Sequence, residues 1–189
     1  MSRSSFAARG PVARLGLEIL EDRRTPAAMG GASELITAVA GDTGSSPIGA
    51  LYNPTGEVRV FLPVYEGTFT GGVRVATADF TGDGEADLVA GPGPGRVTQV
   101  RVINGLTGVD VFTFTAFEET FTGGVFVATG DFNGDGVADI VVSPDVTGGP
   151  RVRVLSGTDP ANVVLADFFG IEDVNFRGGA RVGVGDVNG

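Results

Sequence analysis

The sequence FTGGVRVATADFTGDGEADL at residues 69–88 returns as FTGGVFVATGDFNGDGVADI at residues 121–140. The two copies lie 52 residues apart, which is 121 minus 69. The same spacing relates QVRVING at 99–105 to RVRVLSG at 151–157. Because a fixed period of this length marks a repeat architecture, the chain is expected to contain one structural unit at least twice.

A third copy of the unit is expected toward the C-terminus. It aligns Phe169 with Phe117, takes an insertion of three residues, and continues as FRGGARVGVGDVNG, stopping inside its motif. We therefore predict an N-terminal segment at 1–34, largely disordered or a short helix, followed by repeats over 35–189. The repeats divide into a partial unit at 35–68, complete units at 69–120 and 121–175, and a truncated unit at 176–189.

Each unit is predicted to hold four short strands, because apolar residues alternate between turns marked by glycine. Valine and phenylalanine dominate the large apolar residues, which favours strands over helices. In the first complete unit the predicted strands are residues 73–80, 86–90, 98–103 and 110–117. Four antiparallel strands in about 50 residues make one propeller blade. The fold class predicted is therefore all-β, with about three blades of an incomplete β-propeller.

Two other repeat folds fit the sequence poorly. A calcium-binding β-roll repeats about every nine residues, which the observed period excludes. Alternating strands and helices would need amphipathic segments of ten or more residues, and glycine and threonine interrupt every such segment. Open blades would leave strand edges unpaired, so self-association through those edges is also expected.

Composition removes most catalytic chemistry and several kinds of partner. The chain has no cysteine and no histidine, which excludes thiolate or imidazole metal sites and a Ser-His-Asp triad. The formal net charge is -10, and the thirteen basic residues form no compact run in the main body, so nucleic acid is not an expected partner. No apolar run reaches the roughly 20 residues of a membrane span.

Each complete unit contains a nine-residue acidic loop, DFTGDGEAD at 79–87 and DFNGDGVAD at 131–139. Positions 1, 3, 5 and 9 carry side-chain oxygens, and position 7 offers a main-chain carbonyl, as the seventh position of an EF-hand loop does. Glycine at position 6 permits the turn. Oxygen ligands in this number are typical of calcium, with magnesium second. The predicted ligands are Asp79, Thr81, Asp83, Glu85 and Asp87 in one loop, and Asp131, Asn133, Asp135, Val137 and Asp139 in the other.

The alternative is that aspartate and glycine simply make good turns. Two loops in phase with the repeat favour the metal, because three carboxylates in one turn repel each other without a cation. Arg101 and Arg153, also repeated, are expected to face solvent or the neighbouring blade.

At these residues the chain resembles the FG-GAP and VCBS repeat family, whose strand and DxxGDGxxD loop match residues 73–95 and 125–149. The resemblance covers about 35–189 and implies blades of an integrin-α-like propeller whose acidic loops bind calcium. It carries ligand roles to both sets of loop residues named above, and would begin a third, incomplete site at Asp186 and Asn188.

The N-terminal sequence LEILEDRRTPA at 17–27 resembles the LExLEDRxxPA motif of planctomycete-type bacterial surface or secreted proteins. This resemblance implies an export or sorting role and an extracellular or cell-surface location. The alternative is a short amphipathic helix ended by Pro26.

The function expected from both resemblances is non-enzymatic. We expect a calcium-binding repeat module that mediates protein or cell-surface interaction and adhesion, with Ca²⁺ in a structural role. The alternatives are a glycan-binding, lectin-like propeller and a non-catalytic part of a larger carbohydrate-active enzyme. A lectin fits less well, because the chain has no tryptophan and only two tyrosines for stacking on sugars. A glycosidase needs a suitably spaced carboxylate pair, for which Glu118 and Glu119 are the only obvious candidates.

Overall fold

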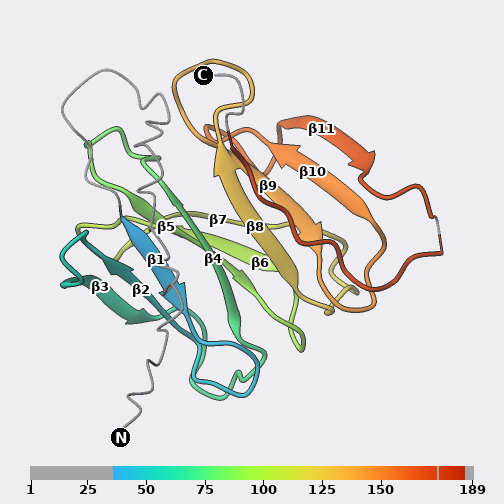
Figure 1. The fold of residues 1–189 in the computed structure, drawn as a ribbon, viewed down its shortest axis with the longest axis horizontal. Coiled ribbons are helices and arrows are strands. Elements are labelled where there is room, and N and C mark those ends of the chain that lie inside the picture. Colours follow the sequence, from blue (N-terminus) through green and yellow to red (C-terminus); the bar gives the residue numbers. More distant parts are fainter. Residues whose placement is uncertain (1–35, 174, 186–189) are drawn as a thin grey trace, which may run out of the picture.

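The computed structural model describes residues 36–173 and 175–185, and the N-terminal segment predicted at 1–34 lies outside them. Every regular element in this range is a β-strand (Figure 1). No helix among the described residues is long and apolar enough to cross a membrane. The strands are β1 Thr37–Ala40, β2 Ile48–Tyr52, β3 Val58–Pro63, β4 Val73–Ala78, β5 Asp87–Pro92, β6 Gln99–Ile103, β7 Asp110–Thr115, β8 Val125–Gly130, β9 Asp139–Pro144, β10 Arg151–Leu155 and β11 Val164–Phe169.

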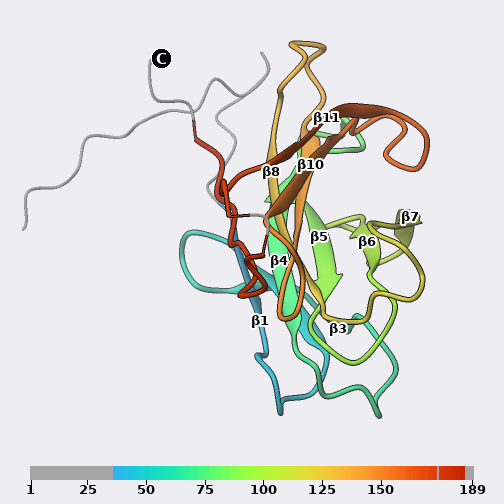
Figure 2. The ribbon, with the colours of Figure 1, turned by 90° about the vertical axis from the view of Figure 1, so that its right-hand side faces the viewer.

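The strands form three antiparallel sheets that follow one another along the chain (Figures 1 and 2). Their orders are β1-β2-β3, β4-β5-β6-β7 and β8-β9-β10-β11, so each strand pairs with its neighbour in sequence. The prediction of all-β blades built from four antiparallel strands is confirmed for the second and third sheets. The first sheet shows three strands within the described residues.

The four strands predicted in the first complete unit are all present in the second sheet. β4 ends at Ala78, two residues before the predicted end, because the acidic loop begins at Asp79. β5 continues to Pro92, beyond the predicted end at Ala90. Backbone pairing across β4 and β5 joins Val73 to Pro92, which explains the extension.

The register of the third sheet corrects the alignment of Phe169 with Phe117. Phe168 lies opposite Val152, as Phe114 lies opposite Val100 in the second sheet. The extra residues therefore enter mainly between β10 and β11, before the outer strand, and Phe168, not Phe169, is the counterpart of Phe114. A surface turn accommodates such an insertion with little cost to the sheet.

The sheets pack face to face, and the cores lie between them. Between the first and second sheets, Leu51, Val64 and Tyr65 pack with Leu88 and Ile103. Between the second and third sheets, residues of both faces form the largest cluster: Val89, Val100, Val102, Phe114, Ala116, Phe117, Val125, Val127, Ile140, Val142 and Leu155. The middle sheet therefore buries apolar side chains on both faces, as the blades of a propeller do.

Two arginines lock neighbouring sheets together. Arg101 on β6 donates a hydrogen bond to the carbonyl oxygen of Val64 in the first sheet. Arg153 on β10 donates the equivalent bond, 2.6 Å long, to the carbonyl oxygen of Ala116 in the second. The repeated arginines are thus contacts between blades, one of the two roles expected for them.

Candidate metal loops

The two acidic loops occupy the same place in consecutive sheets. One joins β4 to β5 and the other joins β8 to β9. Gly82 and Gly84 have φ angles of 72° and 86°, and Gly134 and Gly136 repeat them at 73° and 85°. This left-handed backbone is open to glycine with little penalty, so the glycines at positions 4 and 6 allow both loops the same tight path.

The first acid of each loop organises the turn. Asp79 accepts hydrogen bonds from the N–H groups of Gly82 at 2.6 Å and Gly84 at 2.9 Å, one on each carboxylate oxygen. Asp131 accepts the same two bonds, from Gly134 at 2.7 Å and Gly136 at 3.0 Å. The side chain of position 1 therefore holds the backbone of positions 4 and 6 in both loops.

The acid at position 5 is held in the same way and lies at the surface. Asp83 accepts a bond from the N–H of Glu85 at 2.9 Å and a second from the side-chain amide of Asn104 at 3.2 Å. The bond from Glu85 lowers the pKa of Asp83 below its usual value. Asp135 accepts the matching bond from Val137 at 2.8 Å. Both carboxylates are exposed, and the bond from Glu85 favours the ionised form of Asp83.

Position 7 presents its backbone to the loop. The side chain of Glu85 turns away to pair with Arg59 on β3 at 2.5 Å. In the second loop Val137 holds this position without any charge. The two residues share only their backbone groups, which fits a ligand role for the main-chain carbonyl.

Position 9 differs from the other acids because it is fully buried. Asp87 accepts bonds on one oxygen from the N–H groups of Phe80 at 2.8 Å and Thr81 at 3.1 Å. Its other oxygen accepts from the N–H of Gly105 at 2.9 Å. Burial raises the pKa of Asp87, and the neighbouring charge of Asp83 adds to the shift. Asp139 repeats the arrangement with Phe132 at 2.8 Å and Gly157 at 3.0 Å.

The predicted ligands therefore fall into two groups. The side chains at positions 3 and 5 are exposed in both loops and those at position 1 are half-buried or exposed, whereas the carboxylate at position 9 is buried and accepts bonds from backbone amides behind the loop. Among residues 36–173 and 175–185, no three acidic side chains converge into a group that could hold a metal ion as they stand. Asp186 and Asn188, the predicted start of a third site, lie outside the described residues.

The glycines that meet position 9 are part of the site that sequence reasoning did not single out. Gly105 and Gly157 follow β6 and β10 in the repeated stretches QVRVING and RVRVLSG. A Cβ atom on Gly105 would lie 1.9 Å from the carbonyl oxygen of Ala86, and one on Gly157 would lie 1.8 Å from that of Ala138. Glycine is therefore required where the turn after β6 or β10 approaches the acidic loop. Its recurrence 52 residues apart was the signal from which the sequence could have identified this part of the site.

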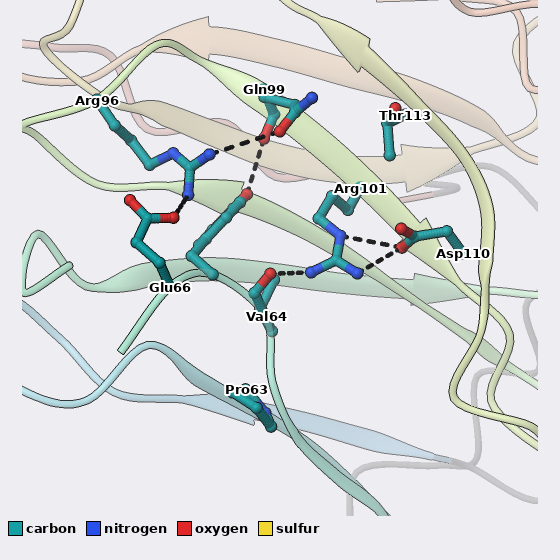
Figure 3. A pocket seen from close by; sticks show the side chains of 9 residues that line it. Pro63, Val64, Glu66, Arg96, Gln99, Arg101, Asp110 and Thr113 are labelled. Atoms are coloured by element: carbon teal, nitrogen blue, oxygen red, sulfur yellow. Dashed lines mark hydrogen bonds and ion pairs between the residues drawn. The ribbon is translucent and has the colours of Figure 1, made fainter. Parts of the chain in front are cut away.

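Outside the loops, the charged groups at the junction of the first two sheets are paired with one another (Figure 3). Arg96 pairs with Glu66 at 2.6 Å, and Arg101 pairs with Asp110 at 2.8 Å. They line a hollow of about 430 Å³, and these four charged side chains are engaged in ion pairs with each other. Elsewhere, Glu118 pairs with Arg151 at 3.3 Å.

Comparison with known protein families identifies an FG-GAP-like repeat at residues 79–142. The matched segment begins at the first residue of one acidic loop and includes all of the other. Residues 79–142 therefore match an FG-GAP-like repeat, which confirms the resemblance drawn from the acidic loops. This family is a structural and binding module rather than a catalytic one.

Proposed function

We propose that this chain, an FG-GAP repeat module, binds calcium through its two acidic loops and serves as an interaction or adhesion module of an extracellular or cell-surface protein. The observation that carries the proposal is the repetition of the loop in consecutive blades. Both loops have the same carboxylate-to-amide bonds and leave oxygens on the same exposed side.

The residues present suit a hard cation. Oδ2 of Asp79 accepts a single bond, from Gly84, and Oδ1 accepts one from Gly82 and a long one of 3.5 Å from the hydroxyl of Thr81, so the carboxylate keeps lone-pair capacity for a metal. Asp83, Thr81 and the carbonyl of Glu85 add oxygens from the same loop, and Asp131, Asn133, Asp135 and the carbonyl of Val137 provide the second set. Such all-oxygen sets are typical of calcium. When bound, calcium would neutralise the carboxylates and stiffen the turn.

Asp87 and Asp139 are the predicted ligands whose present contacts differ most from a metal-binding arrangement. As they lie, both anchor the loop to the following turn through Gly105 and Gly157. To act as ligands they would have to exchange amide bonds for the ion. We therefore assign the first contacts with calcium to positions 1, 3, 5 and 7, with position 9 supporting the loop from behind.

The extracellular assignment rests on the repeat family, which is typical of surface proteins, and on the N-terminal resemblance. Extracellular modules bind calcium with dissociation constants on the order of 10⁻⁴ to 10⁻³ M. At millimolar calcium this affinity would stabilise the fold by roughly 0.5 to 1.5 kcal/mol per site. Calcium would therefore be structural, holding the blade surfaces that contact a partner.

Detection of an epitope-tagged protein on intact, unpermeabilised cells tests the location.

Calorimetric titration with calcium, together with thermal unfolding in calcium and in chelator, tests the metal proposal. We expect binding by both described loops and a higher midpoint in calcium. Asp79→Asn and Asp131→Asn should each remove one of the two binding events, because each weakens one loop. Glu119→Gln is the matched control, since it removes the same charge from an exposed residue outside the loops.

No binding heat and no shift in a folded protein would contradict the metal proposal. So would equal loss in the Glu119→Gln control, because the effect would then follow net charge rather than the loops. Replacing calcium with magnesium separates the two cations that the oxygen ligands allow.

A further inference from the structure

Within the described residues, the first sheet has no counterpart to the strand that is innermost in the other two. In the second and third sheets, β5 and β9 each pair on one side with an inner strand, β4 or β8. β1 holds the place of β5 in the first sheet, and within the described residues it pairs only with β2. One edge of β1 therefore presents backbone groups to which an antiparallel strand could pair.

Residues 180–185 lie where the inner strand of a further blade would begin. Its sequence ARVGVG follows FRGG, as VFVATG of β8 follows FTGG. Ala180 donates a hydrogen bond to the carbonyl of Pro144 at 3.2 Å, and Val182 packs on Val141, Val152 and Val154 of the third sheet. In the part of the chain that the structure describes, this segment pairs with no second strand.

The two outer faces of the array expose apolar residues that the inner faces bury. Phe168 on β11 is 51% exposed, whereas Phe114, at the same position of the second sheet, is 6% exposed. Val39 on β1 is 48% exposed, whereas its counterpart Ala90 on β5 is fully buried. Adjacent sheets meet twice within the chain, each time through the same two kinds of face. The exposed face of the third sheet and the exposed face of the first correspond to these two kinds and could therefore pack against each other.

We propose that these surfaces take a second copy of this chain, with residues 180–185 of each copy pairing with β1 of the other. Each copy then supplies two complete sheets, three strands of another, and the inner strand that completes its partner's. That makes three blades per copy and six in the dimer, within the four to eight of closed propellers. The two contacts are related by a two-fold axis, so the assembly closes instead of growing into a fibre.

The repeat predicts the register of the new pairing. Val75 on β4 lies opposite Ala90 on β5. Val182 holds the position of Val75 in its repeat, and Val39 holds the position of Ala90, because β1 pairs with β2 as β5 pairs with β6. Val182 of one copy should therefore lie opposite Val39 of the other.

The mass of the full 189-residue chain in solution is the first test, measured by light scattering after gel filtration. We expect a mass of twice the 19.2 kDa of one chain, and this mass should stay the same when the protein is diluted. A mass of one chain would overturn the proposal, and so would a broad series of higher masses, because a non-closing contact gives open assemblies.

Cysteine cross-linking tests the register and separates contacts within a copy from contacts between copies. The distinction is needed because Ala40 and Arg181 line the same hollow near the inner strands of one copy. The chain has no native cysteine, so Val39→Cys and Val182→Cys, made in separate chains, form one defined pair when mixed and mildly oxidised. Residues directly opposite on antiparallel strands are close enough for a disulfide.

We expect the mixture to give a covalent dimer that contains one chain of each variant. The control replaces Val39→Cys by Val58→Cys, an exposed valine on the outer strand of the same sheet, which should give no such product. A chain carrying both Val39→Cys and Val182→Cys that links only to itself would overturn the proposal in favour of closure within one copy. None of these results depends on calcium, so failure of this inference leaves the metal proposal standing.

Discussion

The carboxylate of Asp87 accepts a hydrogen bond from the backbone N–H of Gly105 at 2.9 Å, and the pair ties the acidic loop to the turn between β6 and β7. The last acid of the loop is thereby built into the blade, whereas Thr81 and Asp83, at positions 3 and 5, remain exposed. Stability and metal affinity should consequently respond to different residues of the same loop.

Asp87→Asn should lower the free energy of unfolding by about 2 to 3 kcal/mol, because the new side-chain NH₂ group faces buried N–H donors and leaves at least one unpaired. Asp79→Asn should cost less than about 1 kcal/mol in chelator, since water reaches the amides that its carboxylate holds. Urea unfolding of both variants in chelator measures the difference. Equal losses would show that position 9 has no special structural role.

Tyr65→Phe should lower the free energy of unfolding by about 1 kcal/mol, the usual worth of a buried hydrogen bond. The buried hydroxyl of Tyr65 has one proton to share between the carbonyl oxygens of Ala90 at 3.0 Å and Gln99 at 2.8 Å, across the junction of the first two sheets. Phe117 fills the same position at the next junction, so the ring alone fits there.

Thermal unfolding of Tyr65→Phe beside the parent protein provides the measurement. The matched comparison is Phe117→Leu, which removes ring packing instead of a hydrogen bond. An unchanged midpoint for Tyr65→Phe would mean that the two carbonyls find other donors.

Gly105→Ala should destabilise the protein by more than about 2 kcal/mol, because its Cβ would overlap the backbone oxygen of Ala86 and the turn would have to move. Gly67→Ala is the matched control, since a Cβ there meets nothing within 4 Å and its φ is not positive. We expect the control to be neutral or slightly stabilising. Denaturant unfolding measures both variants, with the midpoints compared at an unchanged dependence of the unfolding free energy on denaturant concentration. A Gly105→Ala protein as stable as the parent would contradict the close approach of Gly105 to the backbone of Ala86.

Asp167 should give the protein a small acid-sensitive increment of stability. A hydrogen bond from Arg151, 2.6 Å away, holds the pKa of Asp167 below its usual value. A lowered pKa in the folded state means that the increment is complete above the unfolded pKa, about 3.9, and is lost as the pH falls through the folded value. Because both side chains are about one-third exposed, the pair should contribute less than about 1 kcal/mol.

Asp167→Asn should therefore be slightly less stable than the parent near pH 7 and equal to it at pH values below the folded pKa. Urea unfolding at a series of pH values measures this convergence. A difference that persists unchanged at low pH would assign the effect to packing rather than charge.

Much of the architecture could be predicted from the sequence because it is encoded locally. The 52-residue repeat, the alternation of valines and the glycine turns are visible in the sequence alone, and they predicted every strand end of the second sheet to within two residues. The acidic loops were equally visible, since positions 1 to 9 are contiguous. The family match at residues 79–142 agrees with that prediction.

Tertiary structure decided what depends on contacts between distant residues. Asp87 meets Gly105 across 18 residues, and Arg153 reaches the carbonyl of Ala116 across 37, neither of which a local pattern specifies. The position of the insertion in the third sheet was set by backbone pairing, which placed Phe168 opposite Val152. By itself the sequence determined the blade and its loops, because short-range geometry suffices for strands and turns. The direction of the buried carboxylates and the open faces of the array came from packing between sheets, where side chains far apart in the chain compete for the same space and the same amides.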